Sequence, residues 1–303
     1  MLVLEDNFST KLQCETYIAL GNFDGLHMGH LSLIKKVVEL SKKNNKKSMV
    51  LTFKNHPLSI INSSLKPKLL MSKGTKIKFF DSLGVDIVNF ITFDSRMMKM
   101  LPEDFLRNLQ CYYNANGIVV GFNFKFGYKN QGNVELLSSL KDKLNLETYV
   151  MEPVIFDNEV ISSSRIRELI AEGNVASANK LLMESYGVAG KVVKGRQIGR
   201  TIGFPTLNLE IEDSFLIPGR GVYHTVTNIN DKFYKSITNI GVNPTVNGEK
   251  LTVECHVLDF SEEIYGSSVI VHFIDRIRDE KKFNSIDELK EQLNKDKAYV
   301  LTK

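Results

Sequence analysis

Two histidines, separated by a methionine and a glycine, lie at the end of a glycine-rich turn near the start of the chain. Residues 21–30 read GNFDGLHMGH and lie between an apolar run at 17–20 and an amphipathic run at 31–42. A strand, a glycine-rich turn and a helix form an arrangement that binds phosphate, because free backbone N–H groups and the helix N-terminus attract anions. His27 and His30 would add N–H donors directed at the same anion. We therefore expect a phosphate site at this turn.

Two other interpretations of the histidine pair stay open. His27 and His30 are three residues apart, which also suits zinc, although no carboxylate or cysteine at ligand spacing completes the set. The pair could also consist of polar residues that cap a helix. The glycine-rich turn before them favours phosphate over both alternatives.

A second group of polar residues suits an anion further along the chain. Residues 161–167 read ISSSRIR, so that Ser163 and Ser164 would lie at a helix N-terminus with Arg167 three residues beyond. Hydroxyls, exposed N–H groups and a guanidinium together bind phosphate, although a serine N-cap followed by an exposed charge gives the same pattern. Two phosphate sites in one chain would suit a nucleotidyl transferase, which needs a second site for the departing pyrophosphate. Its catalysis consists of positioning and charge neutralisation, which Mg²⁺ is expected to assist.

A third group could bind nucleotide phosphates without a P-loop, since the chain contains neither GxxxxGK[ST] nor GxGxxG. Residues 190–195 (GKVVKG) and 199–208 (GRTIGFPTLN) combine glycines with basic residues. Thr206 and Asn208 are two residues apart and point to the same side of an extended segment. Their oxygens suit Mg²⁺ carried with ATP. The alternative is an ordinary surface hairpin loop.

A carboxylate on a later strand could act as a general base. Residues 252–257 read TVECHV, and Glu254 shares the polar face of this segment with Thr252 and His256. The opposite, apolar face consists of Val253, Cys255 and Val257. A carboxylate fixed on a strand suits proton abstraction from a sugar hydroxyl, whereas the alternative is an ordinary exposed glutamate.

The elements that must position these groups alternate between strand and helix in the first half of the chain. The expected strands are residues 16–20, 48–53, 86–93, 117–120 and 147–150, and the expected helices are 30–42, 73–83, 102–113 and 134–144. Repeated strand–helix units predict an α/β, Rossmann-like domain with a parallel sheet covered on both faces. Ligands then bind at the carboxyl ends of the strands, where His27 and His30 would lie.

The pattern changes near residue 187, after two expected helices at 163–173 and 175–183. Short strands are expected at 190–194, 221–229, 233–240, 251–258 and 268–273, with turns that include 230–231 and 247–248. This pattern predicts a small antiparallel barrel or sandwich. The sequence Ser-Ile-Asp-Glu at 285–288 is a capping box, so a final helix should close the domain. We expect two domains, residues 1–184 and 185–303.

Composition excludes several classes of protein. The 303 residues carry 39 basic and 35 acidic side chains, a net charge of +4 that is too balanced to indicate nucleic-acid binding. The basic residues at 42–47 are expected in a solvated loop. The three cysteines are far apart and form no CxxC motif, and no apolar run has the length of a membrane span. We expect a cytoplasmic enzyme with small-molecule partners, and the sequence does not indicate its oligomeric state.

The motifs of the first half resemble those of a known family. Residues 21–30 resemble the HxGH signature of adenylyl- and cytidylyltransferases, and together with 52–57, 120–127 and 162–167 they resemble the bacterial bifunctional riboflavin kinase/FAD synthetases. The resemblance implies that this half joins AMP from ATP to FMN, giving FAD and pyrophosphate. It implies an ATP site made of Gly21, Phe23, Asp24, Gly25, His27, His30, Ser163, Ser164 and Arg167, and a flavin and nucleotide pocket made of His56, Pro57, Asn123, Phe124 and Phe126.

The second half continues the resemblance, because residues 203–208 (GFPTLN) are similar to the family's GFPTAN kinase motif. The family's kinase half is a six-stranded barrel that transfers the ATP γ-phosphate to riboflavin. The resemblance implies that Glu254 is the base and that Thr206 and Asn208 meet Mg-ATP. The expected ATP-binding residues of this half are Gly195, Arg200, Gly203, Phe204, Pro205, Thr206 and Asn208. Riboflavin, FMN and FAD are then substrates and products rather than prosthetic groups.

Some questions stay open in the sequence. Phe122, Phe124 and Phe126 have strand spacing, which would place all three on one face, either as core or as a direct contact with flavin. The rival functions are an enzyme with one surviving activity, a flavin-binding regulator, and a nucleotidyl transferase for another phosphate ester. Intact candidate residues in both halves favour an enzyme with two activities.

Overall fold

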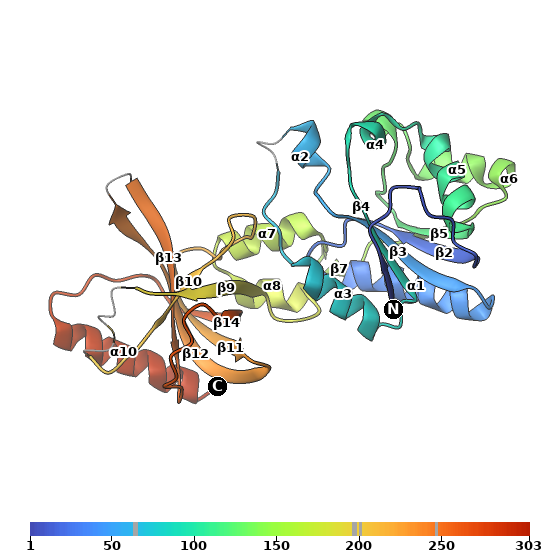
Figure 1. Ribbon diagram of the computed structural model, residues 1–303. Coiled ribbons are helices and arrows are strands. Elements are labelled where there is room, and N and C mark those ends of the chain that lie inside the picture. The colour runs from blue at the N-terminus through green and yellow to red at the C-terminus, as the bar shows by residue number, and fades with distance from the viewer. Residues whose placement is uncertain (63–65, 196–198, 200–201, 246–247) are drawn as a thin grey trace. The chain divides into compact units, whose positions relative to one another are not determined.

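The computed structural model describes residues 1–62, 66–195, 199, 202–245 and 248–303. The expected Arg200 and the expected turn at residue 247 lie outside these described residues. The chain forms two compact units, which are labelled by element in Figure 1. The first comprises Met1–Pro67 and Met71–Ser162, and the second comprises Lys68–Leu70 and Ser163–Lys303.

The first unit is built on a six-stranded sheet in the order β1-β4-β3-β2-β5-β6. Every neighbouring pair is parallel, which confirms the Rossmann-like sheet predicted from the sequence. The strands are β1 (Leu2–Leu4), β2 (Thr16–Leu20), β3 (Lys47–Phe53), β4 (Ile87–Ile91), β5 (Ala115–Gly121) and β6 (Glu147–Met151). The short edge strand β1 was not predicted.

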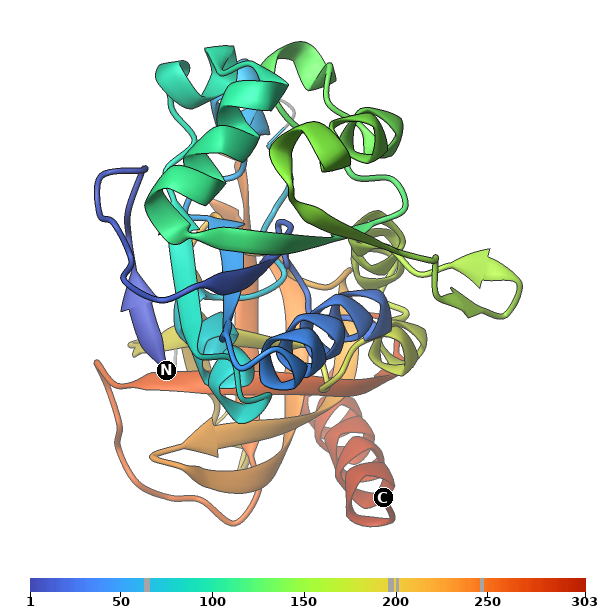
Figure 2. The same ribbon diagram turned by 90° about the vertical axis from the view of Figure 1, so that its right-hand side faces the viewer.

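Helices cover both faces of this sheet (Figures 1 and 2). On one face α1 (Met28–Lys43) and α3 (Lys73–Ser82) pack on a core that includes Tyr17 and Ala19. On the other, α5 (Pro102–Tyr113) and α6 (Val134–Leu144) pack on a core that includes Ile18 and Leu20. Because successive strand residues point to opposite faces and helices cover both faces, all five residues of β2 are buried.

Helix signals in the sequence correspond to observed caps. Pro102 is the first residue of α5, Glu103 and Asp104 occupy its first turn, and the helix ends at Asn114 in a left-handed conformation. The shorter elements were not predicted, because two to five residues give too little periodicity. They are α2 (Leu58–Ile61), α4 (Ser95–Lys99), the 3-10 turn η2 (Tyr128–Asn130) and the hairpin β7–β8 (Ile155–Phe156, Glu159–Val160).

The second unit contains two helices and a closed antiparallel barrel in the order β10-β13-β12-β11-β14-β9. The expected barrel is therefore confirmed. The helices are α7 (Ser163–Ala171) and α8 (Val175–Leu181), and the strands are β9 (Gly187–Val193), β10 (Leu207–Glu210), β11 (Gly221–Ile229), β12 (Lys232–Thr245), β13 (Gly248–Val257) and β14 (Ser268–Arg278). Asn230 and Asp231 both have positive φ in the β11–β12 turn, as two-residue hairpins require.

The barrel interior holds a network of hydroxyl groups. Thr225 Oγ1 lies 2.8 Å from both Ser236 Oγ and Thr238 Oγ1, and Thr227 Oγ1 lies 3.2 Å from Cys255 Sγ. All five side chains are fully buried. Because each hydroxyl both donates and accepts, the network satisfies polar groups that burial would otherwise leave unpaired.

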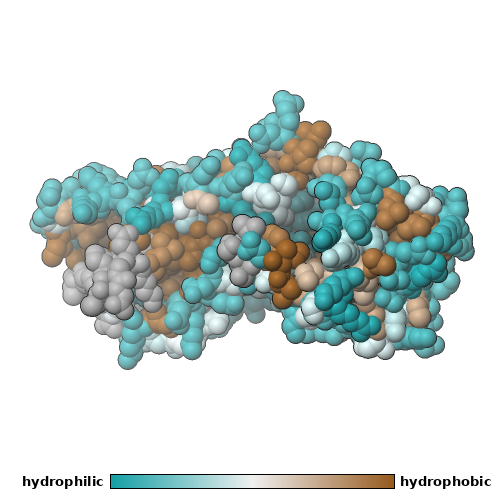
Figure 3. Space-filling view, turned by 90° about the horizontal axis from the view of Figure 1, so that it is seen from above, coloured by the Kyte–Doolittle hydropathy of each residue, from teal (hydrophilic) through white to brown (hydrophobic). Residues whose placement is uncertain are grey.

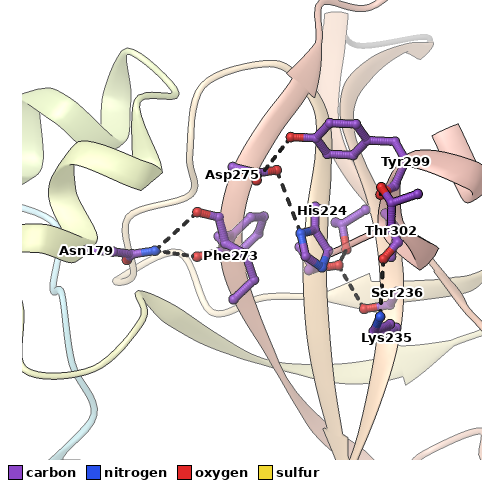
Figure 4. Close-up of polar contacts among 12 residues, drawn as sticks. Asn179, His224, Lys235, Ser236, Phe273, Asp275, Tyr299 and Thr302 are labelled. Atoms are coloured by element: carbon purple, nitrogen blue, oxygen red, sulfur yellow. Dashed lines mark hydrogen bonds and ion pairs between the residues drawn. The ribbon is translucent and has the colours of Figure 1, made fainter.

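The closing helix α10 (Ile286–Leu301) begins as the sequence predicts, with Glu288 N donating to Ser285 Oγ at 3.1 Å. Its Val300 packs with Val222, Ile237 and Leu258. Figure 4 shows Tyr299 and His224 both directed at Asp275, where the Tyr299 hydroxyl lies 3.2 Å from the carboxylate. The helix is therefore attached to the barrel by both apolar and polar contacts.

Three residues from the first half of the sequence complete the second unit. Leu69 N donates to Ser214 O at 2.7 Å, and Leu216 N donates to Leu69 O at 3.0 Å. This contact is tertiary and has no local signal in the sequence. The surface drawn in Figure 3 is largely hydrophilic with scattered apolar patches, as is ordinary for a folded chain.

Candidate active sites

The glycine-rich turn follows the strand at which the sheet order reverses. Strands β3 and β4 lie on one side of β2 and β5 and β6 on the other, so the carboxyl end of β2 is the topological switch point. Ligands of open parallel sheets bind at this position. Because neighbouring strands are parallel, residues 54–57 after β3 and 122–126 after β5 leave the same edge as the turn at 21–27. Three of the predicted segments therefore meet there.

His27 occupies the N-cap of α1, so one of the open interpretations is correct for this residue. Its Nδ1 accepts a hydrogen bond from His30 N at 3.3 Å. The neutral ring consequently carries its proton on Nε2. A Cβ on Gly29 would lie only 3.0 Å from His27 Cε1, so this glycine allows the ring to fold back over the helix start. Capping leaves the Nε2–H group available for a ligand.

The two histidine rings stack on each other, with centroids 3.7 Å apart. Burial lowers the pKa of His27 to about 4, and burial together with the charges of His27 and Lys76 holds the pKa of His30 well below its usual range. Both rings are therefore neutral at physiological pH. His30 Nδ1 is buried without a hydrogen-bond partner among the described residues. His30 also hydrogen-bonds to the Gly25 backbone. Because a phosphate oxygen only accepts, it could be bound by the Nε2–H group of His27 and by His30 in the tautomer that carries its hydrogen on Nδ1.

Two side chains that sequence reasoning missed hold the turn in place. Thr52 Oγ1 and Lys76 Nζ both donate to Asn22 O, at 2.9 and 3.0 Å. Lys76 is only 7% exposed, so a positive charge is buried beside the glycine-rich turn. Phe23 is fully buried against His30 and Phe80, and any contact of Phe23 with a nucleotide would therefore come from its backbone. The sequence gives no signal that Lys76 holds the turn, because α3 contains several lysines.

The loop after β3 places His56 and Pro57 at the start of α2. Leu58 N donates to His56 Nδ1 at 3.2 Å, and Pro57 is the N-cap residue. Asn55, which was not predicted, exchanges two hydrogen bonds with Phe93 at 2.8 and 2.9 Å. Asn55 thus fixes this loop to the segment that follows β4.

The prediction that three phenylalanines share one face is wrong. Strand β5 ends at Gly121, and Phe124 N donates to Gly121 O at 3.0 Å, which closes a turn. Phe122 is consequently 43% exposed, whereas Phe126 is buried and Phe124 stacks on it at 5.4 Å. The turn also leaves Asn123 exposed. The prediction assumed that the strand continues through residue 126, whereas it ends at Gly121.

The serine and arginine group lies in the second unit. Ser163 is the first residue of α7, Ser164 is exposed, and Arg167 Nε donates to Lys68 O at 2.9 Å. The structure therefore brings Ser163, Ser164 and Arg167 together on one helix, and it brings His27 and His30 together on another. The hydrogen bond to Lys68 O orients the guanidinium.

A second site is defined by the register of the barrel strands. Glu254 lies opposite Asn208 on β10 and opposite Asn239 on β12. Cross-strand neighbours point to the same side of a sheet, so the three side chains form one row. Val253, Cys255 and Val257 are buried, which confirms the predicted alternation and places Glu254 on the outer face. Asn239 was not among the predicted residues, and composition alone does not single it out, because β12 also contains Asn243.

Glycines keep this second site open for the predicted residues. A Cβ on Gly195 would collide with the side-chain amide of Asn208. Gly203 has a φ of +82°, the left-handed region that favours glycine. Phe204 is buried, and its N donates to Gly199 O at 2.8 Å. Thr206 then directly precedes β10, and its hydroxyl and the Asn208 amide are oxygen donors of the kind that Mg²⁺ prefers.

In the described part of the chain, neither a metal-binding cluster of His, Cys, Asp and Glu side chains nor a membrane-spanning helix is present. Among residues that the structure describes, no three His, Cys, Asp or Glu side chains gather closely enough to hold a metal ion. A zinc site at the histidine pair thus has no third ligand within that part of the chain. Across the same residues, no helix has the length and apolarity to cross a membrane.

A glycine-rich turn at the switch point of one unit and a six-stranded barrel with a carboxylate–amide row on the other match the arrangement expected from the sequence for a two-site nucleotide-dependent transferase. Family comparison agrees with this class: residues 9–165 match the FAD synthetase family and residues 182–302 match the riboflavin kinase family. The Bacillus subtilis bifunctional riboflavin kinase/FMN adenylyltransferase is 33% identical over 95% of this chain and 92% of its own length. The Escherichia coli K12 protein of the same description is 32% identical over 96% and 93%. The chain belongs to the bifunctional riboflavin kinase/FMN adenylyltransferase family.

A solved structure also matches along nearly the full length. It is described as a macrolide-efflux protein from Streptococcus pneumoniae, and it covers 99% of both chains with a TM-score of 0.89 and 31% identity. That description concerns the Streptococcus protein. For the present chain, the match supports the fold of each unit.

Proposed function

We propose that the barrel phosphorylates riboflavin to FMN and that the histidine turn adenylylates FMN to FAD, each reaction with its own ATP. The observation that carries this proposal is that each half of the chain holds its own candidate group. His27 and His30 lie together at the start of α1, and Glu254 lies opposite Asn208 in the barrel. The two halves match the two enzyme families in the same order. The enzyme is a transferase of flavin cofactor biosynthesis. The proposed functional division is residues 1–184 for adenylylation and 185–303 for phosphorylation.

In the adenylyl transfer, an oxygen of the FMN phosphate attacks the α-phosphorus of ATP. A new phosphoanhydride bond forms, the bond between the α-phosphorus and the bridging oxygen breaks, and pyrophosphate leaves with the electron pair. We assign His27 and His30 to the α-phosphate as neutral N–H donors, because burial keeps both rings uncharged. Ser163, Ser164 and Arg167 would hold the departing phosphates.

No general base is required for this step, because the attacking phosphate is already an anion. The protein contributes positioning and charge stabilisation. The backbone of residues 21–25 follows the switch-point strand and supplies N–H groups for the nucleotide. The remaining pocket residues in this proposal are His56, Pro57, Asn123, Phe124 and Phe126.

In the phosphoryl transfer, Glu254 accepts the proton of the ribityl 5′-hydroxyl while the oxygen attacks the γ-phosphorus and ADP leaves. Glu254 suits this role because a strand fixes it and because Asn208 and Asn239 flank it. Thr206 and Asn208 would hold Mg²⁺ through oxygen atoms. When bound, Mg²⁺ neutralises charge on the transferred phosphate. Gly195, Arg200, Gly203, Phe204 and Pro205 would complete the ATP loop.

The proposal is tested by product analysis after pure protein is incubated with riboflavin and Mg-ATP. We expect FMN to appear first and FAD to follow, with ADP and pyrophosphate as co-products. FMN without FAD would leave only the kinase active. Flavin binding without either product would indicate a regulator, and adenylylation of another phosphate ester in place of FMN would reassign the first site.

A further inference from the structure

His256 lies beside the proposed base at a point where strand pairing ends. It is two residues from Glu254 on β13 and shares the outer face of the barrel with it. The register between β10 and β13 pairs Leu209 with Val253, Asn208 with Glu254 and Leu207 with Cys255, and it stops there. Continued by one step, it would place His256 opposite Thr206. The backbone ladder therefore fixes Asn208 but does not reach Thr206.

The His256 side chain contacts the backbone that the ladder does not reach. Its Nδ1 lies 2.7 Å from Pro205 O. Because a carbonyl oxygen can only accept, Nδ1 must carry the hydrogen and donate it. The ring also packs against Phe204, with centroids 5.2 Å apart. One side chain thus holds the two residues before Thr206 by a hydrogen bond and by a ring contact.

The hydrogen bond acts on Thr206 through the planarity of the peptide bond. Pro205 C=O and Thr206 N belong to the same rigid plane, so fixing the direction of the carbonyl also orients the backbone of Thr206. Burial lowers the pKa of His256, against an opposing effect of the Pro205 carbonyl. The neutral ring must then adopt the Nδ1–H form, and a protonated ring would donate from the same atom. The contact persists in either charge state.

We propose that His256 is a positioning residue of the kinase reaction, which sets the Pro205–Thr206 peptide so that the Thr206 hydroxyl meets Mg-ATP. The inference rests on the proposed kinase function of the barrel. Its role is distinct from that of Glu254, because the imidazole acts on the protein backbone. Loss of His256 should therefore weaken the use of Mg-ATP and leave the riboflavin side of the reaction unchanged.

The test compares three substitutions of His256 in the full chain. His256→Ala should raise the KM for Mg-ATP in FMN production about three- to tenfold, the range expected for one hydrogen bond, while the KM for riboflavin stays constant. His256→Asn should remain within about twofold of the wild type, because its amide nitrogen can occupy the position of Nδ1. His256→Gln should resemble the alanine variant, because its amide lies one bond further out.

A matched control exists on the same barrel. His272 Nδ1 lies 3.4 Å from Ser185 O, a histidine–carbonyl contact outside both proposed sites. His272→Ala should leave the KM for Mg-ATP unchanged. Hydrogen–deuterium exchange gives a readout independent of activity: His256→Ala should speed exchange at residues 202–207, and His256→Asn should restore protection.

Several results would overturn the proposal. An unchanged KM for Mg-ATP in His256→Ala would do so, as would an equal rise in His272→Ala or a failure of His256→Asn to restore either readout. A fall in kcat together with a lower melting temperature, at a constant KM for Mg-ATP, would indicate a merely structural role. If His256→Ala does not fold, the comparison of the asparagine and glutamine variants decides. If the wild-type protein makes no FMN, the kinase proposal itself fails and this one with it.

Discussion

The two proposed sites are built in opposite ways. In the first unit, His27 and His30 stack in a buried position at the start of a helix, and burial keeps them neutral. In the second, Glu254, Asn208 and Asn239 stand in a row on the outer face of a barrel, and strand register holds them. The first site depends on the environment of its side chains, whereas the second depends on alignment between strands.

This difference follows from the chemistry that each site is proposed to perform. A phosphate nucleophile needs no base, so neutral donors at a helix N-terminus are sufficient. A hydroxyl nucleophile must lose a proton, so the kinase site needs a carboxylate at a defined position. Variants that remove one group from each site should therefore separate the two activities.

The largest expected effect comes from the histidine turn. His30→Ala should reduce FAD formation from FMN by about a thousandfold or more, since loss of one charge-stabilising donor typically costs on the order of 10² to 10³ and the His27 ring would also lose its stacking partner. FMN formation from riboflavin should remain near normal. Separate assays with FMN and with riboflavin as substrate measure the two effects. Loss of both activities in a folded variant would contradict independent sites.

Removal of the proposed base should come next in magnitude. Glu254→Gln keeps the shape of the side chain but cannot accept the proton, so FMN production should fall at least about a hundredfold. Riboflavin and ATP should still bind, and FAD synthesis from supplied FMN should be nearly normal. Initial rates and flavin binding by fluorescence provide the check. Near wild-type FMN production would show that Glu254 is an ordinary strand residue.

A smaller effect is expected for the proposed metal ligand. Thr206→Val removes a hydroxyl at nearly constant volume, so the apparent requirement for Mg-ATP in FMN production should rise about tenfold, in the range for hydrogen bonds to charged groups. Thr206→Ser keeps the hydroxyl and serves as the matched variant. Titration of Mg²⁺ at fixed ATP gives the measurement. Equal Mg²⁺ curves for valine and serine would exclude Thr206 as a ligand.

An effect of similar size is expected on stability in acid. His27 has a pKa of about 4 when folded against an ordinary value of 6.5, so the unfolded chain binds a proton first as the pH falls. The contribution of His27 is therefore present above pH 6.5 and is lost progressively toward pH 4. Between pH 7 and 5, the wild type should lose about 1–2 kcal/mol more of its free energy of unfolding than His27→Asn, which retains a capping side chain. Urea unfolding followed by circular dichroism tests this, and parallel losses would contradict it.

Local signals explain what the sequence predicted well. The helices α5 and α6 and the strands β2 and β11 have the expected bounds, because apolar periodicity, Pro102 and the Asn230–Asp231 turn all act within a few residues. The alternation around Glu254 was equally local. The roles of all the proposed site residues remain predictions.

What the sequence did not predict depends on contacts between distant residues. Strand β10 has only four residues and is held by pairing with β9 and β13. Lys76 and Asn239 gain their positions near the sites from α3 packing and from barrel register. The error at Phe122 arose because a turn after Gly121 replaced the assumed strand. Each case needs the folded chain, since none has a periodic signal of its own.

Complementation between two variants tests the central claim of two separate sites most directly. His30→Ala and Glu254→Gln are each incubated with riboflavin and Mg-ATP, first alone and then mixed. We predict that the first makes only FMN, that the second makes almost no product, and that the mixture makes FAD from FMN released by one variant and used by the other. Substantial FAD from either variant alone would contradict the account. So would a mixture that makes no FAD although each folded variant retains its own single activity.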